Sequence, residues 1–383
     1  MYISFKASIE GGTIKSVTSE DGTPTLTNGT YVTEITKNGT YTFTIVGTVD
    51  GEDYETTYTM EVKKYALRAG LNVGDYINYE PDQGTEENPI VYSSTKLSEA
   101  ITGHTGNTAD ITQDDLDWQI LKIYDDGSMD VIGSPTTQTI YFKDAEGYNN
   151  GVYVMDDICE TLYSRGNIKA RSVDLEDFEK NLTGPGKTAK ATYISNQISA
   201  LTTGNYITNV NAENNTVTYV KGRSYYPNIY AEENGSGIDT TTVKTNGIKD
   251  IDTLKDDNGN PTYDTNSGTS AYKQADSNLT VTYTYYNISI NNANYGDASK
   301  ALSNSNSFWV ASRCVNCSSL YAGFGLRYAS TSIYGNSMFL SGNSTRSSFN
   351  LRLRPLVHLG SEVQIEACTG TNGTGNMHTI TQY

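Results

Sequence analysis

The sequence predicts a strand-rich α+β protein in which a small all-β module precedes a larger domain of strands and helices. One observation is the alternation of apolar residues with threonine, which places Tyr41, Phe43 and Ile45 on one face of a strand. A second is composition, because Thr, Asn, Gly and Tyr are abundant whereas Leu and Ala are scarce. A third is a region, residues 154–182, with the apolar spacing of two helices.

Residues 1–65 form the predicted N-terminal module. The Asp50-Gly51 pair marks a tight turn between two runs of alternating apolar residues. A unit of this size is most simply an immunoglobulin-like β-sandwich that serves as a spacer. The chain of 383 residues has room for two or three domains. We therefore expect a linker within residues 63–71 and assign residues 66–383 to a second domain.

A hairpin opens the second domain, because residues 118–123 and 129–132 are apolar strands on either side of the turn residues Asp125-Asp126-Gly127. A first helix should follow, with Val154, Ile158 and Leu162 on one stripe. Its acidic pair, Asp156 and Asp157, is expected near the N-terminal end, where the helix dipole favours negative charge.

A second helix is predicted from the spacing of Leu175, Phe178 and Leu182. Asp174 is placed to cap it, and Asp177 follows three residues later. The helix should end before the segment Gly184-Pro185-Gly186-Lys187-Thr188. That segment resembles the end of a phosphate-binding loop but lacks the motif's first glycine and preceding strand, so it is predicted to be a turn.

Residues from about 186 to 295 are rich in Asn, Thr, Gly and Tyr, with strand-like pieces at 216–220 and 279–283. A structureless loop of this length is uncommon inside a compact domain. We therefore expect an insertion that folds onto the core of the second domain.

The C-terminal region, residues 308–359, alternates strands with polar tracts. Apolar residues recur with period two at Phe308 and Val310, and again at Leu353 and Val357. The tracts between them consist of Ser, Asn, Tyr, Gly and Thr, side chains that suit adaptable binding surfaces. The composition is equally compatible with ordinary solvated loops.

Six motifs of the second domain stand out: Gly147-Tyr148-Asn149-Asn150-Gly151-Val152-Tyr153, Ile158-Cys159-Glu160, Ala170-Arg171-Ser172-x-Asp174-x-Glu176-Asp177, Trp309-x-Ala311-Ser312-Arg313, Phe324-x-x-Arg327 and Leu353-Arg354-Pro355-x-Val357-x-Leu359. They resemble motifs of the C-type-lectin-like domains of surface proteins from gut Clostridia and their phages, and of the variable proteins of diversity-generating retroelements. The similarity covers roughly residues 73–360. In these systems, mutagenesis directed at adenines rewrites chosen codons while the framework is kept.

The resemblance implies a C-type-lectin-like domain with a ligand face between residues 314 and 350. The candidate ligand-binding residues are Cys314, Asn316, Ser318, Ser319, Tyr321, Tyr328, Ser330, Ser332, Tyr334, Asn336, Asn343, Thr345, Ser347 and Asn350. The candidate scaffold residues are Trp309, Arg313, Phe324, Leu326, Leu353, Arg354 and Pro355. Arg327 and Arg352 are left open between scaffold and ligand contact.

Composition disfavours several partner classes. A formal net charge of −17, with 27 basic residues and no basic cluster, argues against nucleic acid or an anionic membrane as partner. There is no apolar run of about 18 residues, so no membrane span is expected. The first residues lack the pattern of a secretory signal, so an exported protein would carry its signal or anchor elsewhere.

Catalytic and metal sites have little support. The three histidines are far apart in sequence, and His358, which alternates with apolar residues, is expected to face solvent. Cys314-x-x-Cys317 has no second ligand pair, and the acidic turn at 256–260 lacks the spacing of a calcium loop. The related formylglycine-generating enzymes use a cysteine pair in a context that these cysteines do not match. We expect no enzyme activity, no metal, no cofactor, and at most one disulfide.

The resulting hypothesis is a binding protein that acts outside the cell, on a cell or virion surface. Its expected partner is a protein or glycan receptor on another cell or host surface, and an oligomer is compatible with this role. The alternative is a structural subunit of a pilus or phage tail that uses the same polar surface for assembly.

Overall fold

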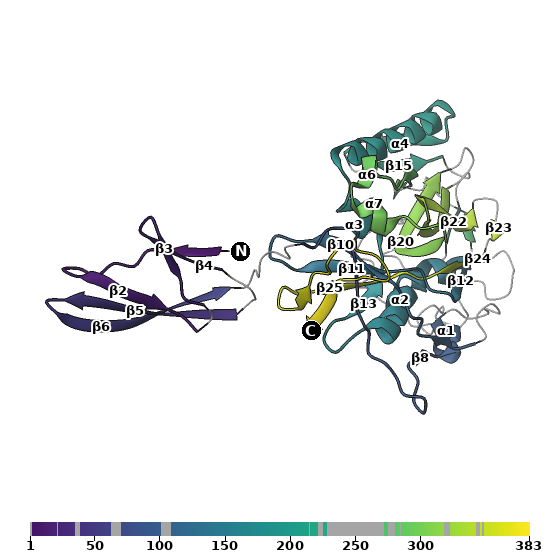
Figure 1. Ribbon diagram of the computed structural model, residues 1–383. Coiled ribbons are helices and arrows are strands. Elements are labelled where there is room, and N and C mark those ends of the chain that lie inside the picture. The colour runs from purple at the N-terminus through teal and green to yellow at the C-terminus, as the bar shows by residue number, and fades with distance from the viewer. Residues whose placement is uncertain are drawn as a thin grey trace, which may run out of the picture.

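The computed structural model shows two bodies, a small one at the N-terminus and a larger one that contains the rest of the chain (Figure 1). It describes residues 2–20, 22–34, 39–62, 70–100, 109–213, 215–220, 225–227, 272–274, 280–283, 285–317, 322–341, 345–346 and 348–383. The predicted coarse class, strand-rich α+β, is confirmed.

The N-terminal module contains two three-stranded antiparallel sheets, in the orders β1-β4-β3 and β2-β5-β6. Phe43 and Tyr41 of one sheet pack with Ile3 of the other in a single small core. The predicted Asp50-Gly51 turn joins β5 to β6, and both residues have positive φ, as a tight hairpin requires. The strands are β1 (Tyr2–Phe5), β2 (Thr13–Thr18), β3 (Thr25–Thr27), β4 (Thr30–Glu34), β5 (Gly39–Val49) and β6 (Glu52–Val62).

The larger domain has a five-stranded antiparallel sheet in the order β13-β25-β11-β10-β7. The predicted hairpin is present as β10 and β11, with a bulge near Ile120. Strand β25, from the C-terminal half of the chain, pairs with β11 and β13, so both halves of the chain contribute strands to this sheet. The strands of this sheet are β7 (Tyr76–Ile77), β10 (Trp118–Ile123), β11 (Met129–Gly133), β13 (Ala170–Ser172) and β25 (Pro355–Leu359).

A second, seven-stranded sheet has the order β12-β24-β20-β21-β22-β19, and β23 pairs with β22. The strands are β12 (Thr139–Lys143), β19 (Ile288–Ser289), β20 (Phe308–Cys317), β21 (Ala322–Ala329), β22 (Ser332–Ser341), β23 (Thr345–Arg346) and β24 (Ser348–Arg352). Two further pairs, β8 (Val91–Tyr92) with β9 (Ile111–Thr112) and β26 (Gln364–Glu366) with β27 (Thr379–Gln382), complete the domain outside the insertion.

Helix α2 (Asp144–Tyr163) packs against both sheets of the larger domain. Val154, Ile158 and Leu162 are buried together, as predicted. The expected position of the helix start was wrong, because α2 begins at Asp144 and its acidic pair, Asp156 and Asp157, therefore lies in the second half of the helix. This pair is too far from the first turn to interact with the positive end of the helix dipole.

The acidic pair of α2 has structural partners. Asp157 accepts a hydrogen bond from the Tyr92 hydroxyl at 2.8 Å and pairs with Lys96. Asp156 accepts the main-chain N–H of Ser172 at 2.9 Å, which ties α2 to the end of β13. The two carboxylates therefore fix neighbouring segments instead of compensating the helix dipole.

In the described part of the chain, the other helices are shorter than α2, with the exception of α4. They are α1 (Ser94–Ala100), α3 (Leu175–Glu179), α4 (Gly184–Thr203), α6 (Asn292–Tyr295) and α7 (Ala298–Leu302). Asp174 caps α3 as predicted, in a reciprocal capping box with Asp177. Leu182 was expected inside this helix, but α3 ends at Glu179 and Leu182 packs in the core beyond it.

The segment predicted to be a turn at 184–188 is instead the first part of α4. Thr183 caps this helix by accepting the N–H of Gly186 at 3.1 Å, and Pro185 lies in the first turn, where its missing N–H costs no helical hydrogen bond. The Gly-Pro-Gly sequence misled the prediction because proline is compatible with both a turn and a helix start.

The described part of the insertion packs on the core of the larger domain. Tyr283, Tyr286 and Ile194 belong to the same buried cluster as Trp309 and Leu326. The strand-like pieces at 216–220 and 279–283 form β15 and β18, which pair with each other. The insertion strands are β14 (Ile207–Asn211), β15 (Thr216–Tyr219), β16 (Tyr225–Pro227), β17 (Tyr272–Gln274) and β18 (Thr280–Thr282). The acidic turn considered at 256–260 lies outside the described residues.

We predict that Gly186→Ala destabilises the fold although alanine favours helices. A Cβ at this position would clash with the main-chain carbonyl of Asn294, so α4 and α6 would have to separate. We expect a loss of about 1–3 kcal/mol in the free energy of unfolding, measured by urea denaturation. Lys187→Ala, at an exposed neighbouring position, should change it by less than about 0.5 kcal/mol. Equal effects of the two changes would contradict the packing argument.

Candidate ligand-binding face

The region predicted to bind ligand lies in the seven-stranded sheet, on the neighbouring antiparallel strands β20, β21 and β22. The polar tracts were expected between strands, but residues 314–317 belong to β20 and residues 332–337 belong to β22. Ser and Asn in these tracts hide the strands from sequence patterns, because they carry little β-propensity. The described part of the face is thus largely a sheet surface.

Six of the seven predicted scaffold residues are buried. Trp309 donates its indole N–H to the carbonyl of Ile140 at 2.8 Å, and Arg313 donates to the carbonyl of Tyr148 at 2.6 Å. The buried residues are Trp309, Arg313, Leu326, Leu353, Arg354 and Pro355. Phe324 lies in β21, and its side chain is outside the described part of the chain. These contacts hold the strands in place by burying their side chains and pairing their donors.

A bulge in β20 connects the sheet to helix α3. The register passes from Val310 opposite Arg327 to Arg313 opposite Leu326, which leaves two residues of β20 out of the ladder. The first of these, Ala311, donates its main-chain N–H to the carbonyl of Val173 at 2.8 Å. The hydroxyl of the second, Ser312, accepts the N–H of Leu175 at 2.9 Å. The bulge therefore fixes the start of α3 against the candidate face.

Two tyrosines form a stacked pair at the end of the β21–β22 hairpin. Tyr328 and Tyr334 are opposite each other in the register, with ring centroids 4.8 Å apart and planes inclined by 16°. Both rings are half-buried, and burial together with the neighbouring Tyr334 raises the pKa of the Tyr328 hydroxyl. Ser330 and Ser332, also half-buried, close the turn between them. The stacked rings of Tyr328 and Tyr334 thus lie next to the serine hydroxyls of the turn, which can donate or accept hydrogen bonds.

The other predicted ligand residues are placed unevenly. Asn350, on β24, is exposed, whereas Cys314 is fully buried and cannot contact a ligand on this surface. Asn316, Asn336 and Thr345 lie in strands, with side chains outside the described part of the chain. Ser318, Ser319, Tyr321, Asn343 and Ser347 lie outside the described residues altogether.

The two arginines whose role the sequence left undecided, Arg327 and Arg352, have different surroundings. Arg327 is fully buried, and its guanidinium lies 4.7 Å from the ring centroid of Tyr286 in the insertion. Arg352 is half-buried and donates to the carbonyl of Thr136 at 2.8 Å. Arg327 is therefore not presented to a ligand, because the insertion covers it. Spacing in the sequence does not predict this cover, because Tyr286 and Arg327 belong to segments that are separate along the chain.

A second group of polar side chains lies away from this face, around Asp130. This buried carboxylate accepts hydrogen bonds from the Tyr124 hydroxyl at 2.7 Å and from Lys180 at 2.5 Å, and it contacts His358 Nδ1 at 2.8 Å. Burial acts to raise the pKa of Asp130, but the hydrogen bonds from His358 and Lys180 outweigh it and hold this pKa well below its usual value. The hydrogen bond to Asp130 raises the pKa of His358. His358 is half-exposed, so it faces solvent while bound to Asp130.

Within the described residues, the structure brings no metal-binding group of three or more His, Cys, Asp or Glu side chains together. Cys159 and Cys368 are free thiols. Among the helices in the described ranges, none is both long and apolar enough to cross a membrane.

Comparison with known proteins places this chain in no family. No family model, no curated protein and no solved structure matches it.

Proposed function

We propose that this chain is a surface-displayed ligand-binding protein, an adhesin or receptor-binding protein, that uses the hairpin end of β21 and β22 as part of its contact surface. The observation that carries the proposal is the stacked pair Tyr328–Tyr334, half-exposed on strands whose neighbouring residues are buried. Tyrosine offers a large amphipathic contact at a low cost in conformational entropy, and serine and asparagine adapt their hydrogen bonds around it.

The finer fold and the origin of the surface belong to the same proposal. The N-terminal module is proposed to be an immunoglobulin-like spacer, and the larger domain a C-type-lectin-like domain with the insertion packed on it. The polar residues of the region 308–359 are proposed to be diversified by a retroelement, and the protein to act on a cell or virion surface. A genomic neighbourhood with a reverse transcriptase and a near-copy of the coding segment, differing chiefly at adenines, would support this origin; a segment identical among related isolates would contradict it.

We expect Tyr328→Ala and Tyr334→Ala each to weaken binding by about 1–3 kcal/mol, or roughly 5- to 150-fold in Kd. Each change should lower the free energy of unfolding by less than about 2 kcal/mol, because the rings are only half-buried. The measurement is binding of the labelled full chain to intact bacterial cells and to a glycan array, with urea denaturation in parallel. Tyr54→Ala, at an exposed tyrosine of the N-terminal module, is the matched control.

Two outcomes would contradict this role for the tyrosine pair. A large loss of stability with unchanged binding would make the pair part of the core. Concentration-dependent assembly of the wild-type chain in light scattering, abolished by both changes, would favour a pilus or phage-tail subunit.

A further inference from the structure

The N-terminal module contains a strand that is only partly paired on one side. Strand β5 pairs with β6 along its whole length, from Gly39 to Val49. On its other side β2 pairs only with residues 44–48 of β5, from Thr18 opposite Thr44 to Thr13 opposite Thr48. Among the described strands, none pairs with residues 39–43 on that side. An open strand edge offers main-chain donors and acceptors at the spacing of a further strand.

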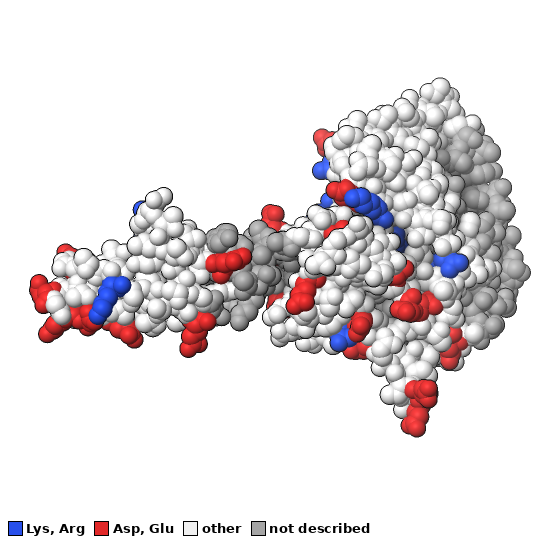
Figure 2. Space-filling model, in the orientation of Figure 1, with Lys and Arg blue, Asp and Glu red and all other residues white. Residues whose placement is uncertain are grey.

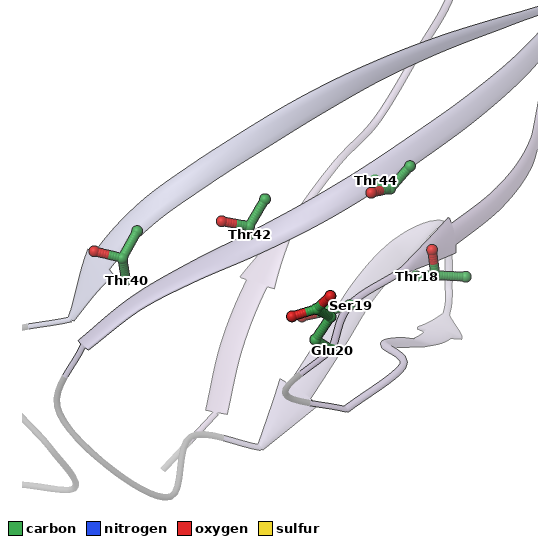
Figure 3. Close-up of a pocket in the computed structure, with 6 residues that line it drawn as sticks. All are labelled: Thr18, Ser19, Glu20, Thr40, Thr42 and Thr44. Atoms are coloured by element: carbon green, nitrogen blue, oxygen red, sulfur yellow. The ribbon is translucent and has the colours of Figure 1, made fainter.

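A groove lies beside this open edge, where β2 ends and the chain turns away from β5 (Figure 3). Threonine side chains from the outer face of β5 line one wall, and the end of β2 with the following turn lines the other. The lining residues are Thr18, Ser19, Glu20, Thr40, Thr42 and Thr44. The groove holds about 550 Å³, within the range of about 300–1,000 Å³ common for ligand clefts.

The alternation along β5 explains why the groove is polar. Tyr41 and Phe43 point into the core of the module, so Thr40, Thr42 and Thr44 must point to the opposite face. The lining residues that the structure describes include no aromatic ring that could stack on a sugar. The open backbone edge and the short β-branched side chains instead suit an extended peptide, which strand addition binds through main-chain hydrogen bonds.

Charge indicates which peptide would fit. Among the described residues that line the groove, Glu20 is the one with a charged side chain. Residues 1–62 contain nine acidic side chains and three lysines, and the acidic groups on the visible face gather mainly at the free end of the module and along its lower side (Figure 2). Two copies of the module would therefore repel each other, whereas a basic segment would be attracted.

We propose that this groove binds an extended peptide segment by strand addition to residues 39–43 of β5, with a lysine or arginine of the peptide beside Glu20. The segment continues the line of β2 and runs antiparallel to β5, since β2 itself is antiparallel to it. Its side chains alternate between the threonine face and the opposite face.

The test uses the full chain and three fluorescein-labelled heptapeptides at low ionic strength. The first alternates threonine and valine around a central lysine; the second has glutamate and the third proline at the centre. We expect the lysine peptide to raise the fluorescence anisotropy with a Kd at least about tenfold lower than that of the glutamate peptide, and the proline peptide not to bind, because it lacks a main-chain donor. Bound lysine peptide should also slow hydrogen exchange at residues 39–43.

Variants of the chain locate the site. Glu20→Lys and Thr42→Lys should each weaken binding of the lysine peptide by about three- to fivefold or more. Thr59→Lys, opposite Thr42 on β6 and outside the groove lining, should leave the Kd unchanged. Absence of binding, equal binding of the proline peptide, or insensitivity to both groove variants would overturn the proposal. So would binding of maltoheptaose in the groove without protection of residues 39–43, which would identify a sugar site.

Discussion

Arg354→Ala is expected to remove about 3–5 kcal/mol from the free energy of unfolding. The side chain is fully buried and donates to the carbonyl of Gly133 at 2.8 Å, to that of Leu302 at 2.8 Å and to that of Ala301. Its guanidinium also lies 4.9 Å from the ring centroid of Phe308. Alanine would leave these carbonyls without this donor and would open a cavity in the core.

The position of Arg354 explains why the effect should be large. The chain leaves the seven-stranded sheet at the end of β24, Arg352, and enters the five-stranded sheet at the start of β25, Pro355. Arg354 lies at this crossing and bonds to the end of β11 and the end of α7. One side chain therefore ties the crossing segment, a strand and a helix together at a single point.

Urea denaturation of Arg354→Ala, Arg354→Met and Arg352→Met would test this role. Methionine at position 354 keeps most of the apolar part of the side chain. Arg354→Met should therefore lower the free energy of unfolding by less than Arg354→Ala does, by about 2–3 kcal/mol. Arg352→Met removes a half-buried arginine two residues away and should cost less than about 1 kcal/mol. If Arg354→Met and Arg352→Met lowered the free energy of unfolding by similar amounts, the burial of Arg354 would not be the source of its contribution to stability.

Asp177→Ala is expected to cost a similar amount, about 3–5 kcal/mol. Asp177 is fully buried and accepts two hydrogen bonds from Arg171, both at 2.6 Å, in a bidentate pair. It also accepts from Lys180 at 2.8 Å and from the main-chain N–H of Asp174 at 2.9 Å. Removing the carboxylate would leave two cations next to each other without this partner and would break the capping box of α3.

Asp177→Asn separates charge from hydrogen bonding, because the amide keeps the size of the side chain and one acceptor oxygen. We expect Asp177→Asn to lower the free energy of unfolding by less than Asp177→Ala does, but still by more than about 1 kcal/mol. Glu176→Ala, exposed in the same turn of α3, should change stability by less than about 0.5 kcal/mol. Thermal unfolding followed by circular dichroism would rank the three variants. Asp177→Asn as stable as the wild type would contradict a role for the charge.

Local patterns predicted much of the fold. The turn at Asp50-Gly51, the hairpin of β10 and β11 and the cap at Asp174 were predicted because each depends on a few neighbouring residues. The start of α2 and the whole of α4 were not predicted. Glycines inside α2 and the Gly-Pro-Gly sequence at the start of α4 are residues that usually interrupt helices, so the local sequence argued against a helix there. In α2, Gly151 lies where a Cβ would crowd Leu326, so its presence reflects tertiary packing.

The candidate site was less predictable than its frame. Trp309 was predicted to be a scaffold residue from the resemblance, and its buried indole N–H, which needs an acceptor, donates to the carbonyl of Ile140. The burial of Cys314 could not be predicted, because its neighbours in the sequence are mostly polar. The cover of Arg327 by Tyr286 joins residues from the insertion and the C-terminal strands, a pairing that spacing along the chain does not encode.

The cover of β21 on both sides limits how this region can evolve. Leu326 and its neighbour Arg327 point to opposite faces of the strand, and both are fully buried, one near α2 and the other under the insertion. Substitutions in this part of the strand would be removed by selection for folding before they altered any contact outside the molecule. A repertoire of viable variants on this frame would therefore accumulate at the hairpin end, around Tyr328 and Tyr334.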